Sequence, residues 1–222
     1  MPLGLIFDVD GVLADTEAIS AQACTDAFRT LYDVEIPLEE HRAFIGATPQ
    51  HHVEGLARRY GIRINTEKAV NAHLENFLAR MKDAGDISYP GAQELIQSVL
   101  QYDEWKLGFA TGSGRRRSEA TIAKVGIDPS RFSAWVTGDD VRFAKPDPEI
   151  YLRAASRLDI FPRQCVVIED SVAGLAAAKA ASMHCIAVTN TFPGEALRAA
   201  DRIIDSLEQV SVTMLHDIVA GS

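Results

Sequence analysis

Two aspartates, Asp8 and Asp10, follow directly after a short apolar run at the beginning of the chain. Residues 3–7 read LGLIF, which is typical of a buried strand, and charges at the end of such a run are costly unless they are paired, solvated or bound to a metal ion. One aspartate can act as a nucleophile toward phosphorus and form an aspartyl-phosphate. A second carboxylate two residues away can then serve as acid and base for the leaving and incoming oxygens. The pair therefore predicts phosphoryl transfer.

Residues suited to binding an anion follow two later apolar runs. Thr111 supplies a hydroxyl donor, and Gly112 lets backbone N–H groups approach an anion where the next helix begins. Lys145 supplies a fixed positive charge that can neutralise a transferring phosphoryl group. Asp139 or Asp140 is a candidate to anchor Lys145, and an ordinary loop acid is the alternative for both.

A further acidic pair, Glu169 and Asp170, follows another apolar run. Clustered carboxylates repel one another and need a cation, and a set of oxygen ligands suits Mg²⁺. Taken alone, Glu169 and Asp170 could instead be acids favoured at a helix N-terminus, and an isolated Asp-x-Asp is common on loops. Each acidic group follows a separate expected strand, and this shared position favours a single magnesium and phosphate site.

The elements that must position these residues alternate along the second part of the chain. After Tyr89 we expect strands at 106–110, 134–137, 165–168 and 185–189, a further strand at 202–204, and helices near 92–102, 115–126, 147–158 and 172–181. Residues 206–209 match a capping box for the last helix. Together with strand 3–7, this alternation predicts an α/β fold, a doubly wound Rossmann-like parallel sheet covered on both faces. Ligands bind beyond the carboxyl ends of the strands in such sheets, where the polar residues above are expected.

Residues 14–88 show only helical periodicity. Thr48-Pro49 is typical of a helix start and Gly61 of its end, and a second helix is expected from Asn65 to Gly85. The segment interrupts the alternating pattern after the first strand. We therefore expect an α/β core domain formed by residues 1–13 and 89–222, with residues 14–88 inserted as an all-helical cap domain that can act as a lid.

Composition narrows the class of protein. The chain has 222 residues and a net charge of −9, which argues against a nucleic-acid or anionic-membrane binder because both need basic surface. No stretch approaches the roughly 20 apolar residues of a membrane helix, and the first residues lack the pattern of a signal peptide. The three cysteines form no Cys-x-x-Cys pair. A cytoplasmic protein with reduced thiols is expected, monomeric by default and acting on a small molecule.

Four segments resemble the motifs of the haloacid dehalogenase-like hydrolase superfamily. They are DVDGVLADTE (8–17), ATGS (110–113), KPDPEIY (145–151) and VVIEDSVAGLAAAKAA (166–181), in the order and spacing of that family. The helical insertion after the first motif is similar to the cap of the subgroup that contains β-phosphoglucomutase and small sugar phosphatases. The resemblance covers nearly the whole chain.

The resemblance implies a role for each motif residue. Asp8 would be the phosphorylated nucleophile, and Asp10 would be the general acid and base. Asp8, the backbone carbonyl of Asp10 and Asp170 would bind Mg²⁺, with Glu169 as a direct or indirect ligand. Thr111 and Lys145 would hold the phosphoryl oxygens. The presence of Asp10 also argues against a dehalogenase, since that branch of the family lacks the second aspartate.

Two departures from the mutase pattern bear on the substrate. The mutases carry a histidine after the DTE-like stretch, where this chain has Ile19 and Ser20, and an arginine shortly after the glycine that matches Gly46, where this chain has none. A mutase must hold a bisphosphate and reorient it, so it needs cationic side chains on the cap. We therefore expect a Mg²⁺-dependent phosphatase of small phosphorylated metabolites, with sugar phosphates as the expected class. The alternatives are a β-phosphoglucomutase-type mutase and a non-catalytic binding protein on the same fold.

Three further residues are candidates for substrate contacts. His51 lies at the start of a cap helix beside His52, and His73 lies one helical turn from apolar residues of its own helix, so packing or solvent exposure is the alternative for each. Arg115 begins the run Arg115-Arg116-Arg117 just after the phosphate loop. Of these three arginines we expect Arg115 to reach the substrate, and a solvated helix face is the alternative.

Overall fold

A computed structural model describes residues 1–45 and 47–221. A single six-stranded parallel sheet, in the order β3-β2-β1-β4-β5-β6, forms its centre. The strands are β1 (Leu3–Phe7), β2 (Trp105–Ala110), β3 (Ala134–Val136), β4 (Cys165–Glu169), β5 (His184–Val188) and β6 (Arg202–Ile204). The doubly wound α/β fold expected from the alternating sequence pattern is confirmed.

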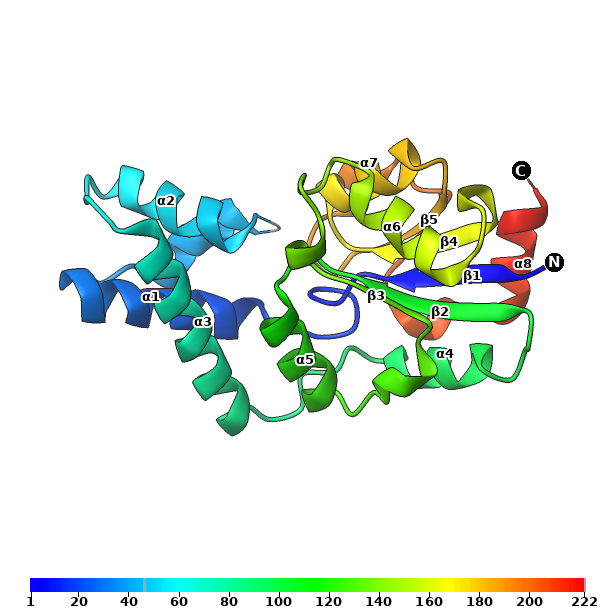
Figure 1. Ribbon diagram of the computed structural model, residues 1–222, viewed down its shortest axis with the longest axis horizontal. Helices are drawn as coiled ribbons and strands as arrows, with labels where there is room; N and C mark the ends of the chain where they lie inside the picture. The colour runs from blue at the N-terminus through cyan, green and yellow to red at the C-terminus, as the bar shows by residue number, and fades with distance from the viewer. Residues whose placement is uncertain (46, 222) are drawn as a thin grey trace.

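Helices cover both faces of this sheet (Figure 1). On one face lie α4 (Ala92–Val99), α5 (Arg115–Lys124) and α8 (Val212–Ala220), whose apolar side chains pack with Leu5 and Phe7 of β1. On the other lie α6 (Glu149–Leu158) and α7 (Val172–Ala180), which pack with Ile6. Because successive side chains of a strand point to opposite faces, β1 contributes to both cores and is buried throughout.

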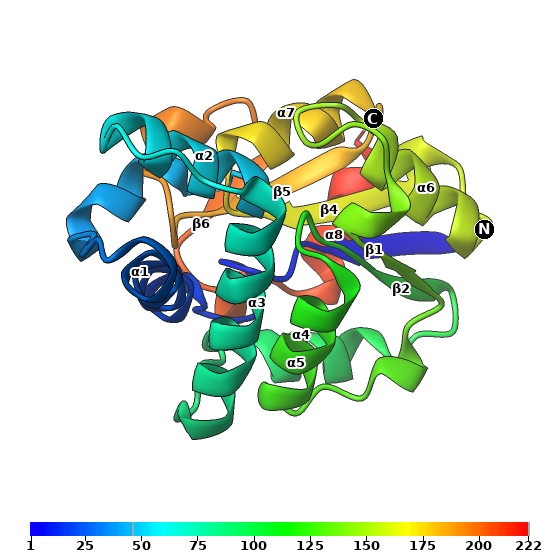
Figure 2. The same ribbon diagram turned by 60° about the vertical axis from the view of Figure 1, so that its left-hand side comes forward.

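Of the α-helices between β1 and β2, the three that precede α4 lie beyond one end of the sheet (Figures 1 and 2). They are α1 (Glu17–Tyr32), α2 (Pro49–Arg59) and α3 (Thr66–Asp83), with a 3₁₀ helix at Leu38–Phe44. Thr48 caps α2 through the backbone N–H of His51, and Asn65 caps α3 through that of Lys68, as the sequence predicts. We call residues 14–88 the helical segment; it has its own apolar cluster, built around Phe28, Val53 and Leu56.

Several element ends differ from the sequence-based expectation. Ser206 caps only a 3₁₀ helix at Leu207–Gln209, and the last helix is capped by Ser211, so the prediction that residues 206–209 cap the last helix was wrong. Helix α3 ends at Asp83, before Gly85. Helix α4 stops at Val99 rather than near residue 102, because the chain turns sharply there to enter β2.

The carboxyl ends of the strands face the helical segment (Figure 1). Helix α3 runs beside α5 of the sheet layer, and Arg116 of α5 forms an ion pair with Glu75 of α3 at 2.7 Å. No helix within the two described ranges is both long and apolar enough to cross a membrane.

Candidate active site

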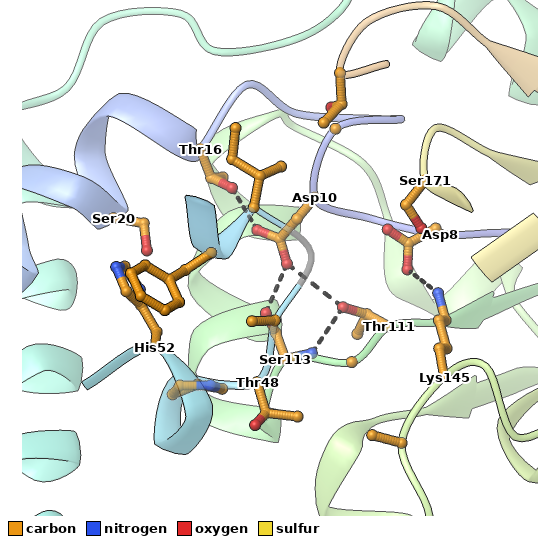
Figure 3. Close-up of a pocket in the computed structure, with 18 of the residues that line it drawn as sticks. Asp8, Asp10, Thr16, Ser20, Thr48, His52, Thr111, Ser113, Lys145 and Ser171 are labelled. Carbon is orange, nitrogen blue, oxygen red and sulfur yellow. Dashed lines mark hydrogen bonds and ion pairs between the residues drawn. The ribbon is translucent and has the colours of Figure 1, made fainter. Parts of the chain in front are cut away.

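Lys145 joins two carboxylates at the ends of neighbouring strands. Asp8 follows β1 and Glu169 ends β4, and the Nζ atom of Lys145 lies 2.7 Å from Oδ1 of Asp8 and 2.6 Å from Oε1 of Glu169 (Figure 3 shows the contact with Asp8). Burial alone would lower the pKa of Lys145, but the charges of Asp8 and Glu169 raise it. The lysine is therefore a permanently charged group beside Asp8.

Glu169 is directed into the protein. Its Oε1 also accepts a hydrogen bond from the hydroxyl of the buried Tyr151 at 2.7 Å. Its Oε2 accepts from the backbone N–H of Asp170 and from both the N–H and the hydroxyl of Ser171. Both carboxylate oxygens are thus engaged, and the side chain is fully buried, so the geometry favours an indirect role beside a metal ion over direct ligation.

Asp10 faces a ring of donors. Its Oδ1 accepts from the Thr16 hydroxyl at 2.5 Å, and its Oδ2 accepts from the hydroxyls of Ser113 at 2.6 Å and Thr111 at 3.4 Å (Figure 3). Arg117 approaches Oδ1 at 3.4 Å. Burial would raise the pKa of Asp10, but the Arg117 charge and these hydrogen bonds outweigh it and lower the pKa. Asp10 is therefore held as a carboxylate.

Asp8 and Asp170 have the opposite electrostatic environment. Burial, with the neighbouring charges of Glu169 and Asp10, raises the pKa of Asp8 to about 7 against the opposing effect of Lys145. Burial and the charges of Glu169 and Asp8 likewise raise the pKa of Asp170. These carboxylates lack enough compensating positive charge from the protein.

The residues present fit a magnesium ion. The acids are hard oxygen donors, which Mg²⁺ prefers, and a divalent cation would supply the missing charge. Gly11 has a φ of 81°, and a Cβ at this position would lie 1.9 Å from Oδ2 of Asp170, so only glycine lets the loop after β1 pass this close to that carboxylate. Thr191 donates a hydrogen bond to the same oxygen and orients it.

These groups open into one cavity of about 930 Å³ between the sheet and the helical segment. From the sheet side, the cavity is lined by the predicted residues Asp8, Asp10, Thr111, Gly112, Lys145 and Asp170. Glu169 lies behind them. From the helical segment, the cavity is lined by Thr16, Ser20, His41, Phe44, His51, His52 and His73, of which Figure 3 labels Thr16, Ser20 and His52. The structure therefore brings the sequence-predicted core residues together at one site.

The three residues expected to contact the substrate, His51, His73 and Arg115, do not all lie in the cavity. His51 is exposed at the cavity rim, whereas His52 and His73 are buried in its wall. Arg115 was the wrong arginine to single out: its guanidinium contacts the Trp135 carbonyl and the Asp140 carboxylate and does not line the cavity.

Arg117 is the arginine of that run that enters the site. Its Nη1 donates to the Ser20 hydroxyl at 2.9 Å, and its guanidinium lies over the Phe77 ring at 4.1 Å from the centroid. Arg115 and Arg117 are two positions apart, which on a helix is a rotation of about 200°, so they point in opposite directions. The sequence Arg115-Arg116-Arg117 alone does not show which of the three arginines faces the cavity, because that depends on how the helix is rotated against its neighbours.

The acids proposed to anchor Lys145 have other partners. Asp139 accepts from the backbone N–H of Arg115 at the start of α5, and Asp140 binds Thr137 and Arg157. Neither contacts Lys145. Gly46, where the mutase comparison was made, lies outside the described residues.

Sequence reasoning missed several residues that the geometry brings into play. Thr16 and Ser113 bind Asp10, Tyr151 binds Glu169, and Thr191 binds Asp170. Three of them lie inside or beside the quoted motifs, so their nearness to the acids was a usable signal. Thr191 carried none, because it follows a strand that offered no acid or motif.

The carboxyl edge of the parallel sheet carries an Asp-x-Asp loop, a lysine that bridges two carboxylates, and an acidic pair. This arrangement is typical of a hydrolase that transfers phosphoryl groups. The family model described as haloacid dehalogenase-like hydrolase matches residues 5–188. The chain belongs to this family.

Curated relatives and solved structures extend the comparison. The chain is 32% identical over 221 residues to Protein SUPPRESSOR OF QUENCHING 1, chloroplastic, of Arabidopsis thaliana, covering 98% of this chain but only 20% of that protein. It is 32% identical over 209 residues to validoxylamine A 7'-phosphate phosphatase of Streptomyces hygroscopicus subsp. limoneus, covering 92% and 94%. A mutant CbbY from Rhodobacter sphaeroides in complex with xylulose-1,5-bisphosphate superposes with a TM-score of 0.86 at 29% identity, covering 97% of this chain and 99% of that chain.

Proposed function

We propose that the protein is a Mg²⁺-dependent phosphatase of small phosphorylated metabolites that forms an aspartyl-phosphate on Asp8. The observation that carries this proposal is the arrangement of Lys145 at 2.7 Å from Asp8, with Asp10 on the same loop held by Thr16 and Ser113. One carboxylate is thereby placed beside a fixed positive charge, and the other beside hydroxyl donors. Relatives named as phosphatases support the same reaction class.

The chemistry uses the two aspartates in turn. A carboxylate oxygen of Asp8 attacks phosphorus, the bond from phosphorus to the ester oxygen breaks, and Asp10 in its acid form gives that oxygen a proton. An anionic ester beside Asp10 raises its pKa and favours this form. In the second half, a water attacks the aspartyl-phosphate and gives its proton to Asp10, and phosphate leaves with Asp8 restored.

The remaining groups hold the phosphoryl oxygens. Lys145, Thr111 and the backbone around Gly112 are placed to bind them, all on the cavity wall. Asp8, the Asp10 carbonyl and Asp170 would hold Mg²⁺, with Glu169 behind. When bound, the ion supplies charge neutralisation for the phosphoryl group.

The cavity favours a phosphatase over a mutase. Within the described part of the helical segment, no lysine or arginine lines the cavity. Among the described residues, the arginine that pairs with Asp10 is Arg117, which comes from the sheet layer. A second phosphate of a bisphosphate intermediate therefore has no cation of the helical segment to hold it.

The same proposal extends to the domain arrangement, the cellular compartment and the partners of the protein. Residues 14–88 would be the cap domain that closes over the core of residues 1–13 and 89–222, and the substrate enters between them. The three cysteines of the chain are buried and free, which is consistent with work in the reducing cytoplasm. We take the protein to act as a monomer. The net charge of −9 disfavours nucleic acid or an anionic membrane as a partner.

A phosphate-release assay with Mg²⁺ tests the proposal. The panel contains phosphorylated metabolites, among them β-glucose 1-phosphate, and both free phosphate and glucose 6-phosphate are followed, with Asp8→Asn as the control. Phosphate release that disappears in Asp8→Asn is the expected result. Glucose 6-phosphate formation without phosphate release would identify a mutase. Turnover of no ester, with Asp8→Asn indistinguishable from the wild type, would identify a binding protein.

A further inference from the structure

Three buried histidines form one wall of the cavity. His41, in the 3₁₀ helix, His52 on α2 and His73 on α3 are 4%, 8% and 2% exposed and come from separate segments of the chain. The ring of His52 is 5.0 Å from that of His41 and 5.7 Å from that of His73, nearly perpendicular to both. The reaction described above uses none of them.

A chain of hydrogen bonds fixes which nitrogen of His52 carries the proton. The Thr25 hydroxyl donates to the Ile36 carbonyl at 2.9 Å, so it accepts from Nε2–H of His41 at 3.0 Å. Nδ1 of His41 then has a free lone pair and accepts from Nε2–H of His52 at 2.8 Å. As a neutral ring, His52 is left with a lone pair on Nδ1.

His73 reaches the same state by a shorter route. Its Nε2 lies 3.0 Å from the Ser20 carbonyl, which can only accept, so Nε2 carries the proton and Nδ1 a lone pair. Burial, together with nearby charges that include Arg117, lowers the pKa of both His52 and His73 to about 3. The two rings are therefore neutral acceptors at physiological pH.

The charge around the cavity disfavours a second phosphate. Among the described residues that line it, carboxylates outnumber cationic side chains six to three. Lys145 is paired with Asp8, Arg117 with Asp10, and Arg142 is the third cation. A bound Mg²⁺ adds two positive charges, which the transferring phosphoryl group already needs.

A metal ion is the other conceivable partner of this cluster. Cys24, His41 and His52 place potential ligand atoms within 4.8 Å of one another. However, both nitrogens of His41 already have hydrogen-bond partners, and burial raises the pKa of the Cys24 thiol to about 12. The hydrogen-bonded arrangement accounts for the cluster as it stands.

From this arrangement we propose that His52 and His73 accept hydrogen bonds from substrate hydroxyl groups, so that the preferred substrate is the monophosphate of a polyhydroxylated molecule and not a bisphosphate. This inference rests on the phosphatase proposal. Phe44, stacked on His52 at 5.3 Å, lines the same wall and offers an apolar surface for the carbon face of such a molecule.

Three ester comparisons and two pairs of variants test this inference. The esters are glucose 6-phosphate against 2-deoxyglucose 6-phosphate, fructose 6-phosphate against fructose 1,6-bisphosphate, and p-nitrophenyl phosphate as an ester without hydroxyl groups. The variants are His52→Leu and His73→Leu, which remove the acceptor, and His52→Gln and His73→Gln, whose amide oxygen can replace it. Circular dichroism checks that each variant is folded.

The expected result is a change in ratios. Each Leu variant lowers kcat/KM for glucose 6-phosphate relative to p-nitrophenyl phosphate by roughly fivefold, the effect of one hydrogen bond of about 1 kcal/mol, and each Gln variant restores most of it. The wild type prefers fructose 6-phosphate to the bisphosphate. Equal losses on both esters in the Leu variants, or a preference for the bisphosphate, would overturn the inference.

Failure of the phosphatase proposal gives a different result. Absence of Asp8-dependent phosphate release from every ester, p-nitrophenyl phosphate included, would overturn that proposal and this inference with it. Asp8-dependent release from p-nitrophenyl phosphate, with no effect of substrate hydroxyl groups on any variant, would leave the phosphatase standing and overturn the histidine inference alone.

Discussion

The Nη2 atom of Arg117 lies 3.4 Å from Oδ1 of Asp10, although the two residues are 107 positions apart in the chain. The same guanidinium donates to Ser20 and covers the ring of Phe77, both in the helical segment. One side chain of the sheet layer thus contacts the proposed acid and base and the helical segment at once. It is therefore a direct physical link between that segment and Asp10.

Replacement of Arg117 by leucine is expected to lower kcat/KM by roughly 10- to 100-fold, because a hydrogen bond to a charged group is worth about 1.5–3 kcal/mol. The loss should appear with p-nitrophenyl phosphate as well as with sugar phosphates, since Arg117 acts through Asp10. Arg117→Lys keeps the charge and should recover part of the activity. Arg116→Leu is the matched control, since Arg116 is exposed and pairs with Glu75 away from Asp10. Equal effects at the two positions would remove Arg117 from the site.

Asp8→Asn is expected to abolish phosphate release without lowering the melting temperature. Activity is lost because the nucleophile is gone. Stability is kept because the pKa of the Asp8 carboxyl is raised to about 7, which means that the folded state disfavours the charge that the substitution removes. Thermal unfolding and phosphate release are measured on the same preparation. Asp103→Asn, at an exposed position, serves as the control and should keep full activity. A fully active Asp8→Asn protein would contradict the proposed mechanism.

The fold and the core of the site were predictable because their signals are local. Apolar runs alternate with helical periodicity after residue 89, and each acid or hydroxyl follows directly after a run, so topology alone places Asp8, Thr111 and Asp170 at one edge. Parallel pairing of β1 with both β2 and β4 is what brings these separate segments together.

The cavity wall formed by the helical segment and Arg117 was not predictable in the same way. Its residues come from α1, the 3₁₀ helix at Leu38–Phe44, α2, α3 and α5, and their contacts depend on helical phase and on how the helices pack. The choice between Arg115 and Arg117 and the link from His41 to His52 are examples: no run, spacing or cap signal in the chain distinguishes them. Packing between helices distant in sequence determines both.

Removal of divalent metal is expected to stop activity, and Mg²⁺ to restore it. Asp170→Asn should raise the Mg²⁺ concentration for half-maximal activity at least tenfold, about 1.4 kcal/mol of binding free energy, because a ligand charge is lost. A second readout is thermal: Mg²⁺ at 100 times the wild-type Kd stabilises the folded wild type by about 2.7 kcal/mol, so it should raise the melting temperature of the wild type more than that of Asp170→Asn, which binds Mg²⁺ more weakly. Asp217→Asn, exposed on α8, should behave as the wild type. Turnover that is independent of metal would contradict the site.

The buried histidines predict a loss of stability in mild acid. In the unfolded chain a histidine takes up a proton near pH 6.5, whereas His52 and His73 stay neutral in the folded protein down to about pH 3. Between these values the unfolded state binds more protons, so the free energy of unfolding falls as the pH falls, by up to about 1.4 kcal/mol per pH unit for each histidine. Urea unfolding at pH 7, 6 and 5 measures this slope. His73→Gln should reduce it relative to the wild type, while His51→Gln, at an exposed histidine of the same wall, should leave it unchanged. An identical slope in the wild type and His73→Gln would show that His73 is not held as a neutral ring.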